Sequence, residues 1–204
     1  MKYIQKDFRD YINEMEFKDY CIIDPPWRYD DIPPAVTNKQ LTYSLWEDNY
    51  NDLCYIFNNL KVNYLFLWTT NSLLDVVFKS FLDTNNYKYK TCVTWNKLSK
   101  NGVLFYGLGN TFRNSTELLL VFQKEHTPPL RLDLRTSILE ECKERTIKPK
   151  NFEYHLIDNL NNKQMKGVYI FSGYNILDLD IECVDIFEEK ELNKIHIKNE
   201  LTFE

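Results

Sequence analysis

The sequence predicts a three-layer α/β fold with a mostly parallel sheet, and two features of the chain carry this prediction. Short apolar runs rich in β-branched and aromatic residues recur along the 204 residues, and their lengths suit buried strands. Between these runs lie segments whose apolar residues recur at helical spacing. Strands that alternate with helices are typical of a sheet covered by helices on both faces.

The expected strands and helices follow one another along the chain. The strands are the runs 20–23, 64–68, 91–95, 117–122, 168–171 and 181–187. A first helical face consists of Trp46, Leu53, Ile56, Phe57 and Leu60. A second helical face consists of Leu73, Leu74, Val77, Phe78, Phe81 and Leu82. A third begins after Lys148-Pro149 and consists of Phe152, Leu156, Ile157 and Leu160.

Two stretches have the composition of loops. Residues 28–42 carry two adjacent prolines and many polar residues, and residues 96–114 carry three glycines. Each of these stretches follows an expected strand. Because ligands of open α/β sheets bind beyond the carboxyl ends of the strands, we expect both loops to border the functional site.

The charge of the chain is acidic overall but uneven. Lys and Arg number 25 against 30 Asp and Glu, a formal charge of −5, which argues against coating nucleic acid through bulk charge. From 86 to 150, however, 12 Lys and Arg stand against 6 Asp and Glu. This stretch is either an ordinary salt-bridged surface or a basic face for a polyanion. A hydrophobic share of 44% is enough to bury a core and excludes disorder throughout.

Cysteine and histidine usage argues against a metal site. The five cysteines form no C-x-x-C pair, and the three histidines have no metal-ligand spacing to one another or to a cysteine. The N-terminus is charged where a signal peptide is apolar, and no apolar run approaches the ~20 residues of a membrane span. We therefore expect an intracellular protein that is not embedded in a membrane. Its compartment would be the cytoplasm in a bacterium or phage, and the nucleus or cytoplasm in a eukaryotic or viral setting.

The segment Asp24-Pro25-Pro26-Trp27 directly follows the first apolar strand. The prolines end the strand and fix the backbone, so that the acid is held rigidly at its carboxyl end. A carboxylate and a proline carbonyl both accept hydrogen bonds, and together they suit the NH2 group of a flat heteroaromatic base. The tryptophan adds a stacking surface beside them. The ordinary alternative is a strand-ending turn with a capping aspartate.

With this motif in place, the chain resembles the adenine-N6 methyltransferases that carry D-P-P-W after an apolar strand. The group includes the catalytic subunit of the eukaryotic mRNA N6-adenosine methyltransferase and short bacterial and phage relatives. Residues 6–9 resemble the C-D-I/V-R element of the family, and residues 64–70 resemble its F-L-F-L-W-V-T strand. The further segments that resemble family motifs are 94–97, 113–117 and the helix start at 148–149.

The resemblance implies a Rossmann-like, S-adenosylmethionine-dependent methyltransferase fold in permuted order, with the catalytic motif early and the cofactor strand late. The late strand lies in residues 168–175, which resemble the E-L-F-G/A-R motif of the family. Tyr169 stands where that motif has its acid, its arginine is replaced near Ser172-Gly173, and the closing G-N-Q/E motif has no clear match in 184–188. We expect one methyltransferase domain over 1–188 and a charged tail over 189–204.

The resemblance also assigns roles to individual residues. It implies a catalytic segment of Asp24, Pro25, Pro26 and Trp27. The implied cofactor contacts are Asp7, Phe8, Asp24, Lys148, Ser172, Gly173 and Asn175. The implied substrate contacts are Tyr43, Lys97, Arg113 and Asn114. Structural roles compete with some of these, namely a helix-start lysine at 148, a tight turn at 173 and loop packing at 43.

The function that the resemblance implies is methyl transfer from S-adenosylmethionine to the N6 amine of adenine in nucleic acid. Because the sulfonium already activates the methyl group, no metal is required. The target base must be single-stranded or flipped out of a duplex, and we favour DNA over RNA by analogy alone. One alternative is a subunit that has lost catalysis and binds nucleic acid or a partner, and a dimer with itself or a family relative is expected. Another alternative is methylation of a small molecule or a protein amine.

Overall fold

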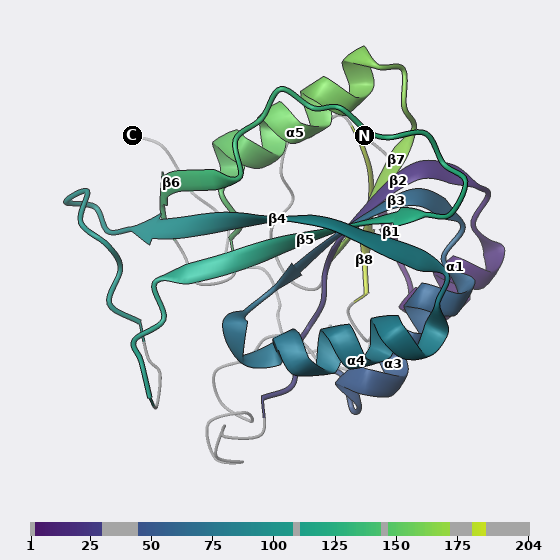
Figure 1. Cartoon of the computed structure of the whole chain (residues 1–204), viewed down its shortest axis with the longest axis horizontal. Helices are drawn as coiled ribbons and strands as arrows, with labels where there is room; N and C mark the ends of the chain where they lie inside the picture. The colour runs from purple at the N-terminus through teal and green to yellow at the C-terminus, as the bar shows by residue number, and fades with distance from the viewer. Residues whose placement is uncertain (1–2, 30–44, 108–110, 144–146, 172–180, 187–204) are drawn as a thin grey trace, which may run out of the picture.

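The computed structural model describes residues 3–29, 45–107, 111–143, 147–171 and 181–186. Within them lies one eight-stranded sheet in the order β1-β8-β7-β2-β3-β5-β4-β6, with helices on both faces (Figure 1). The strands are β1 (Tyr3–Gln5), β2 (Lys18–Asp24), β3 (Val62–Thr69), β4 (Tyr87–Leu98), β5 (Thr116–Lys124), β6 (Ser137–Glu141), β7 (Gly167–Phe171) and β8 (Glu182–Asp185). The helices are α1 (Phe8–Glu14), α3 (Asn49–Asn59), α4 (Leu74–Thr84), α5 (Lys150–Asn162) and the short 3-10 helix η1 (Asn71–Leu73).

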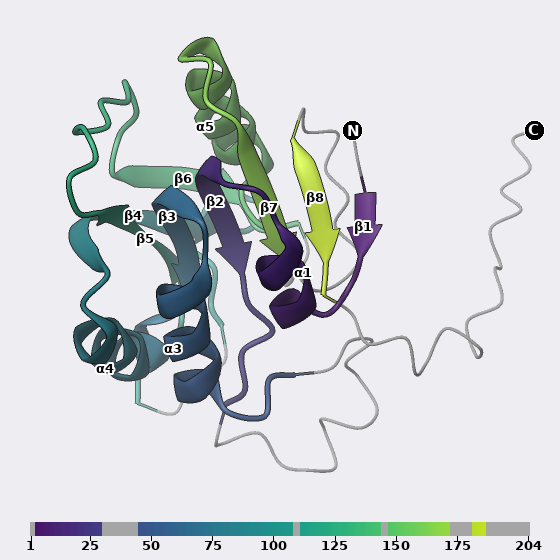
Figure 2. The ribbon, with the colours of Figure 1, turned by 90° about the vertical axis from the view of Figure 1, so that its right-hand side faces the viewer.

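The sheet is mostly parallel, because only β5 runs against its neighbours. It pairs antiparallel with β3 and with β4, whereas every other pair of neighbouring strands in the described sheet is parallel. The carboxyl ends of the parallel strands therefore meet at one edge of the sheet, together with the amino end of β5. Figure 2 shows β8 and β1 beyond β7, which places them at the far side of the sheet from β4 and β6.

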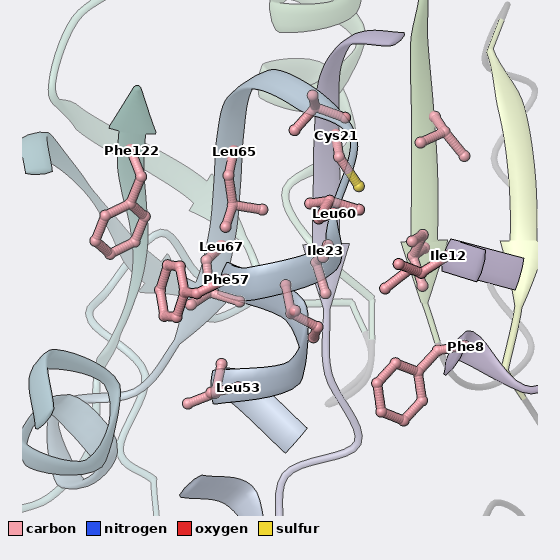
Figure 3. Packing of buried hydrophobic residues seen from close by; sticks show 14 of the residues in the cluster. Phe8, Ile12, Cys21, Ile23, Leu53, Phe57, Leu60, Leu65, Leu67 and Phe122 are labelled. Carbon is pink, nitrogen blue, oxygen red and sulfur yellow. The ribbon is translucent and has the colours of Figure 1, made fainter. Parts of the chain in front are cut away.

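Alternation along β2 explains the three layers. Cys21 and Ile23 belong to one core, which packs against α1, α3 and α4 (Figure 3), whereas Tyr20 and Ile22 belong to a second core beneath α5. β3 alternates in the same way between the two faces. Because successive side chains of a strand point to opposite faces, two strands whose central residues are all apolar dictate helices on both sides of the sheet.

Local chemistry sets several boundaries of these elements. The carboxylate of Asp48 accepts hydrogen bonds from the first backbone N–H groups of α3, as an N-cap residue does. α4 ends at Asn85, which adopts the left-handed conformation with φ 53°. At Gly167 a β-carbon would overlap the ring of Tyr20, so the glycine allows β7 to lie directly beside β2.

The structure confirms the predicted α/β fold with its mostly parallel sheet in permuted order, and all six predicted strands are present. The sequence patterns missed β1, α1 and β6, because two of these are strands of three and five residues at the sheet edges and the third is a seven-residue helix. The placement of Leu82 on a buried helix face was wrong, since its side chain is 62% exposed. It lies five residues after the buried Val77, about 140° around the helix, and so faces solvent.

Candidate active site

The site lies where the order of the strands reverses. β2 leads through α3 to β3 on one side, whereas β7 leads to β8 on the other, and β2 and β7 are neighbours. Asp24, the last residue of β2, is aligned with Phe171, the last residue of β7. Such a reversal opens a crevice outside the carboxyl ends of the strands, and ligands of open α/β sheets bind there.

The segment after β2 is fixed by hydrogen bonds of its own backbone. The carbonyl of Pro25 accepts from the backbone N–H of Trp27 at 2.9 Å, and that of Pro26 accepts from Trp46 at 2.9 Å. The Trp27 indole donates to the carbonyl of Trp68 at 3.1 Å. Its ring is 6% exposed and meets the Trp46 ring edge to face at 5.4 Å. Trp27 thus anchors the segment in the core, while Pro25 keeps one lone pair of its carbonyl for a further donor.

Four charged side chains form what we call the charge cluster: Asp24, Lys148, Glu117 and Lys97. The Lys148 ammonium lies 2.9 Å from Asp24 Oδ1 and 3.1 Å from Glu117 Oε2. Lys97 pairs with the other oxygen of Glu117. The four come from β2, the segment just before α5, β5 and β4, and their side chains are only 11–15% exposed. Antiparallel β5 is the reason that Glu117, at its amino end, reaches the edge where the parallel strands end.

Burial and pairing shift these groups in different directions. Burial raises the pKa of Asp24 to about 6, although Lys148 opposes the effect. Burial also disfavours the charged form of Glu117, but Lys148 and Lys97 outweigh it, and the pKa of Glu117 is lowered. Burial likewise works against the Lys148 cation, yet two carboxylates more than compensate and raise its pKa. The cluster therefore contains one carboxylate, Asp24, that takes up a proton far more readily than an ordinary aspartate.

With this geometry in view, comparison with known proteins decides the family. Residues 18–179 match the sequence profile of the MT-A70 family, and that range runs from β2 past β7. The chain belongs to the MT-A70 family. This match confirms the resemblance, drawn from the D-P-P-W motif, to a family of N6-adenosine methyltransferases. A comparison with curated proteins finds no significant match.

The MT-A70 motif residues on the described strands meet at one place. Asp24, Pro25 and Trp27 are joined by Lys148 and Lys97, which the sequence assigned to cofactor and substrate, respectively. Lys148 is held there because Glu140 of β6 caps α5, accepting from the N–H groups of Asn151 at 2.9 Å and Phe152 at 3.2 Å. The helix start resembling H-S-x-K-P therefore positions a cation directly beside the D-P-P-W motif.

Other assigned residues lie elsewhere or have evident structural partners. Asp7 is the N-cap of α1 and accepts from the backbone N–H of Arg9 at 2.8 Å, and the buried Phe8 ring packs on Trp46 at 5.5 Å. The exposed residues Arg113 and Asn114 lie just before β5. The remaining assignments fall outside the described residues, and they are Tyr43, Ser172, Gly173 and Asn175. The cofactor and substrate roles of all of these stay predictions.

Sequence reasoning missed a buried acid beneath the charge cluster. Glu153 of α5 is 1% exposed, and its Oε1 accepts from the Trp68 indole at 2.9 Å and the Tyr169 hydroxyl at 2.8 Å. Burial raises the pKa of Glu153 to about 7. The Lys148 ammonium stands 5.9 Å from the centre of the Trp68 ring, so Glu153 fixes the ring on which the cation rests. No sequence signal marks Glu153, although the family motif does show that an acid is lost at position 169.

Two further polar groups near this edge were also not predicted. The half-buried Tyr29 hydroxyl lies 3.4 Å from Thr70 Oγ1, and its pKa is raised by burial. Asp185 is buried at the carboxyl end of β8, at the same edge of the sheet as Asp24. Among the described residues, no three His, Cys, Asp or Glu side chains are grouped so as to hold a metal ion. No described helix is both long and apolar enough to cross a membrane.

Proposed function

We propose that this protein transfers a methyl group from S-adenosylmethionine to the N6 amine of adenine in a nucleic acid. The observation that carries the proposal is the pairing of two acceptors, the Asp24 carboxylate and the Pro25 carbonyl, on a rigid turn at the reversal of strand order. Two acceptors on one turn suit an amine that offers two hydrogens. Membership of the MT-A70 family supports methyl transfer as the reaction.

The donor groups at this edge of the sheet fit the proposed cofactor. S-adenosylmethionine presents an ammonium, a carboxylate and ribose hydroxyls, and it supplies a methyl group already activated by its sulfonium. Asp24 suits an ammonium or an amine, whereas Lys148 suits the carboxylate or a hydroxyl. Asp185 ends the strand after β7, where an acid binds ribose hydroxyls in dinucleotide-binding α/β folds. We assign these three residues to the cofactor, with Asp24 shared between cofactor and base.

Asp24 is also the group in this site that is suited to hold the target amine. The N6 lone pair of adenine is delocalised into the ring, and acceptors on its hydrogens orient it toward the donor carbon. Asp24 must be ionised to accept hydrogen bonds from the amine and then the proton that the amine loses. Lys148 opposes the effect of burial, so that Asp24 is ionised above about pH 6. Its raised pKa makes the carboxylate a competent acceptor for the proton that the amine loses.

The target must leave a base stack to reach such a buried acid. A base within a duplex is inaccessible to a carboxylate at the end of a strand, so the substrate is single-stranded or flipped. Lys97, Arg113 and Asn114 are the proposed substrate contacts on the described strands and loops. DNA stays the favoured target, and RNA is tested beside it.

The test is single-turnover transfer of labelled methyl from S-adenosylmethionine to adenine-containing oligonucleotides of DNA and RNA. We expect Asp24→Asn to lose at least about a hundredfold in rate, because the amide keeps the shape but removes the charge and the proton acceptor. Asp75→Asn, an exposed acid on α4, is the matched control and should react like the unchanged protein. Equal rates for Asp24→Asn and Asp75→Asn would reject the assignment of Asp24.

A second candidate is a family member that has lost catalysis and serves as a nucleic-acid-binding or scaffolding subunit. The observation that favours it is Tyr169, which replaces the acid of the family motif at the cofactor strand. Calorimetric titration with S-adenosylmethionine separates the two candidates. Binding by the isolated chain supports the enzyme, whereas binding that needs a partner supports the subunit.

A further inference from the structure

Between β4 and β5 the chain leaves the sheet in an excursion that we call the basic arm, defined as residues 99–107 and 111–115. Figure 1 shows it projecting on the left beyond the arrowhead of β4. Four of its large apolar side chains face solvent, with exposed fractions of 61% for Val103, 58% for Leu104, 77% for Tyr106 and 84% for Phe112, whereas Phe105 is half-buried. Grouped exposed apolar side chains of this kind mark a binding surface more often than isolated ones do.

The basic arm is tied to itself and to the charge cluster by backbone hydrogen bonds. The N–H of Lys97 donates to Ser115 at 2.8 Å, and the N–H of Phe105 donates to Lys97 at 2.7 Å. Farther out, the N–H of Gly107 donates to Asn114 at 3.1 Å. The Lys97 side chain then pairs with Glu117, the acid that Lys148 shares with Asp24. The two flanks of the arm, residues 99–107 and residues 111–115, are thus both bonded to Lys97, a residue of the proposed active site.

Gly107 allows the two flanks to approach. A β-carbon at this position would clash with the carbonyl oxygen of Asn114, so an alanine would push the flanks apart. The side chains on either side of this contact are the two most exposed aromatic rings of the described residues, Tyr106 and Phe112. The contact therefore fixes the backbone from which both rings project.

Within the basic arm the charged residues are Lys100 and Arg113, with no Asp or Glu, on a chain whose formal charge is −5. Acids lie at the base of the arm, since Glu117 pairs with Lys97 and Glu141 of β6 is aligned with Leu98. The Arg113 guanidinium lies 5.2 Å from the centre of the Tyr106 ring. Interfaces between proteins are depleted in lysine, whereas single strands of nucleic acid bind to aromatic rings interleaved with basic groups.

We propose that the basic arm binds single-stranded nucleic acid, with Tyr106 and Phe112 stacking on bases beside the target adenine. Lys100 and Arg113 contact the phosphates between these bases. The proposal rests on the proposed function and extends it, because it places the nucleotides that flank the methylated base. A flipped or unpaired adenine at Asp24 leaves its neighbours unstacked, and the rings of the arm replace the lost stacking.

The experiment uses the full chain and fluorescently labelled 12-nucleotide single strands of DNA and of RNA, each with one adenine. Binding is followed by anisotropy, and a 2-aminopurine placed next to the adenine reports stacking through quenching of its fluorescence. Tyr106→Leu and Phe112→Leu keep apolar exposed side chains but remove the rings. Tyr106→Phe and Phe112→Tyr keep the rings, and Tyr154→Leu, which removes an exposed ring on α5, is the matched control.

We expect each leucine variant to bind the oligonucleotide about tenfold to a hundredfold more weakly and to lose quenching. The ring-retaining variants and the Tyr154 control should bind as the unchanged protein does. Equal affinity and quenching in the leucine variants would overturn the proposal, even if methyl transfer itself is found. Retained nucleotide binding with a changed sedimentation coefficient would overturn it in favour of a contact between copies of the chain. Failure of the unchanged protein to bind or methylate any oligonucleotide, while it still binds S-adenosylmethionine, would reject the nucleic-acid function as well.

Discussion

Replacement of Lys148 by methionine tests the electrostatic design of the site. The ammonium lies 2.9 Å from Asp24 and 3.1 Å from Glu117, and it is the largest influence that lowers the pKa of Asp24 against burial. Opposite charges at such distances lower the pKa of an aspartate by about 1–3 pH units. With the cation removed, the pKa of Asp24 should rise from about 6 into the range of about 7–9.

The assay is the single-turnover methyl-transfer rate as a function of pH. In the unchanged protein the rate should fall as pH drops through about 6, because Asp24 takes up a proton there. In Lys148→Met the same fall should occur about 1–3 pH units higher. Lys97→Met, which removes a more distant cation paired with Glu117, should move it much less. An unchanged acid limb in Lys148→Met would refute the reasoning, whatever happens to the maximal rate.

The same substitution has a consequence for stability whose sign follows from linkage. Because the folded pKa of Asp24 is above its ordinary value of 3.8, ionisation of this group costs stability as pH rises through about 4–6. The total cost is about 3 kcal/mol for the side chain in the unchanged protein. Lys148→Met should extend this loss to higher pH, and it should destabilise the fold by about 3–5 kcal/mol above the raised pKa of Asp24, where two buried carboxylates have lost their cation. Urea unfolding at pH 5 and pH 8 measures both effects.

Three further predictions concern the supports of the site. Glu153→Ala leaves the buried Trp68 indole and the buried Tyr169 hydroxyl without their acceptor, and it should lower the free energy of unfolding in urea by about 2–5 kcal/mol. Glu153→Gln should lower it less, and equal losses in the two variants would contradict this role. Glu140→Ala removes the cap of α5 and should lower the free energy of unfolding by about 0.5–2 kcal/mol in thermal unfolding, while Glu141→Ala, its neighbour, should have a smaller effect. Gly107→Ala should weaken oligonucleotide binding without changing the melting temperature, and an unchanged affinity would show that the approach of the flanks is unimportant.

The sequence predicted much of the fold because the signals involved are local. The apolar runs 20–23 of β2 and 64–68 of β3 require cover on both faces of the sheet, and the helical spacing after Pro149 places α5 on one of them. Asp24 was placed correctly at the end of a strand because two prolines stop the strand immediately after it. Short edge strands such as β1 and β6 carry too few apolar residues to stand out.

Long-range pairing accounts for what the sequence did not reveal. Lys148 meets Asp24 across more than a hundred residues, and the meeting depends on Glu140 of β6 as the cap of α5. Family motifs show a missing acid at Tyr169, but only the folded chain reveals that a carboxylate from α5 lies beside its hydroxyl. Asp7 illustrates the opposite case, since the aspartate that resembles a cofactor motif also caps the helix that follows it.

Adenine-N6 methylation that depends on Asp24 can be measured by mass spectrometry of nucleosides. DNA and RNA are incubated with the purified protein and S-adenosylmethionine, digested to nucleosides and analysed for every methylated species. We predict N6-methyladenine as the product in at least one of the two nucleic acids, and its loss with Asp24→Asn. A methyl group on another atom or base, or N6-methyladenine formed equally by Asp24→Asn, would contradict the account.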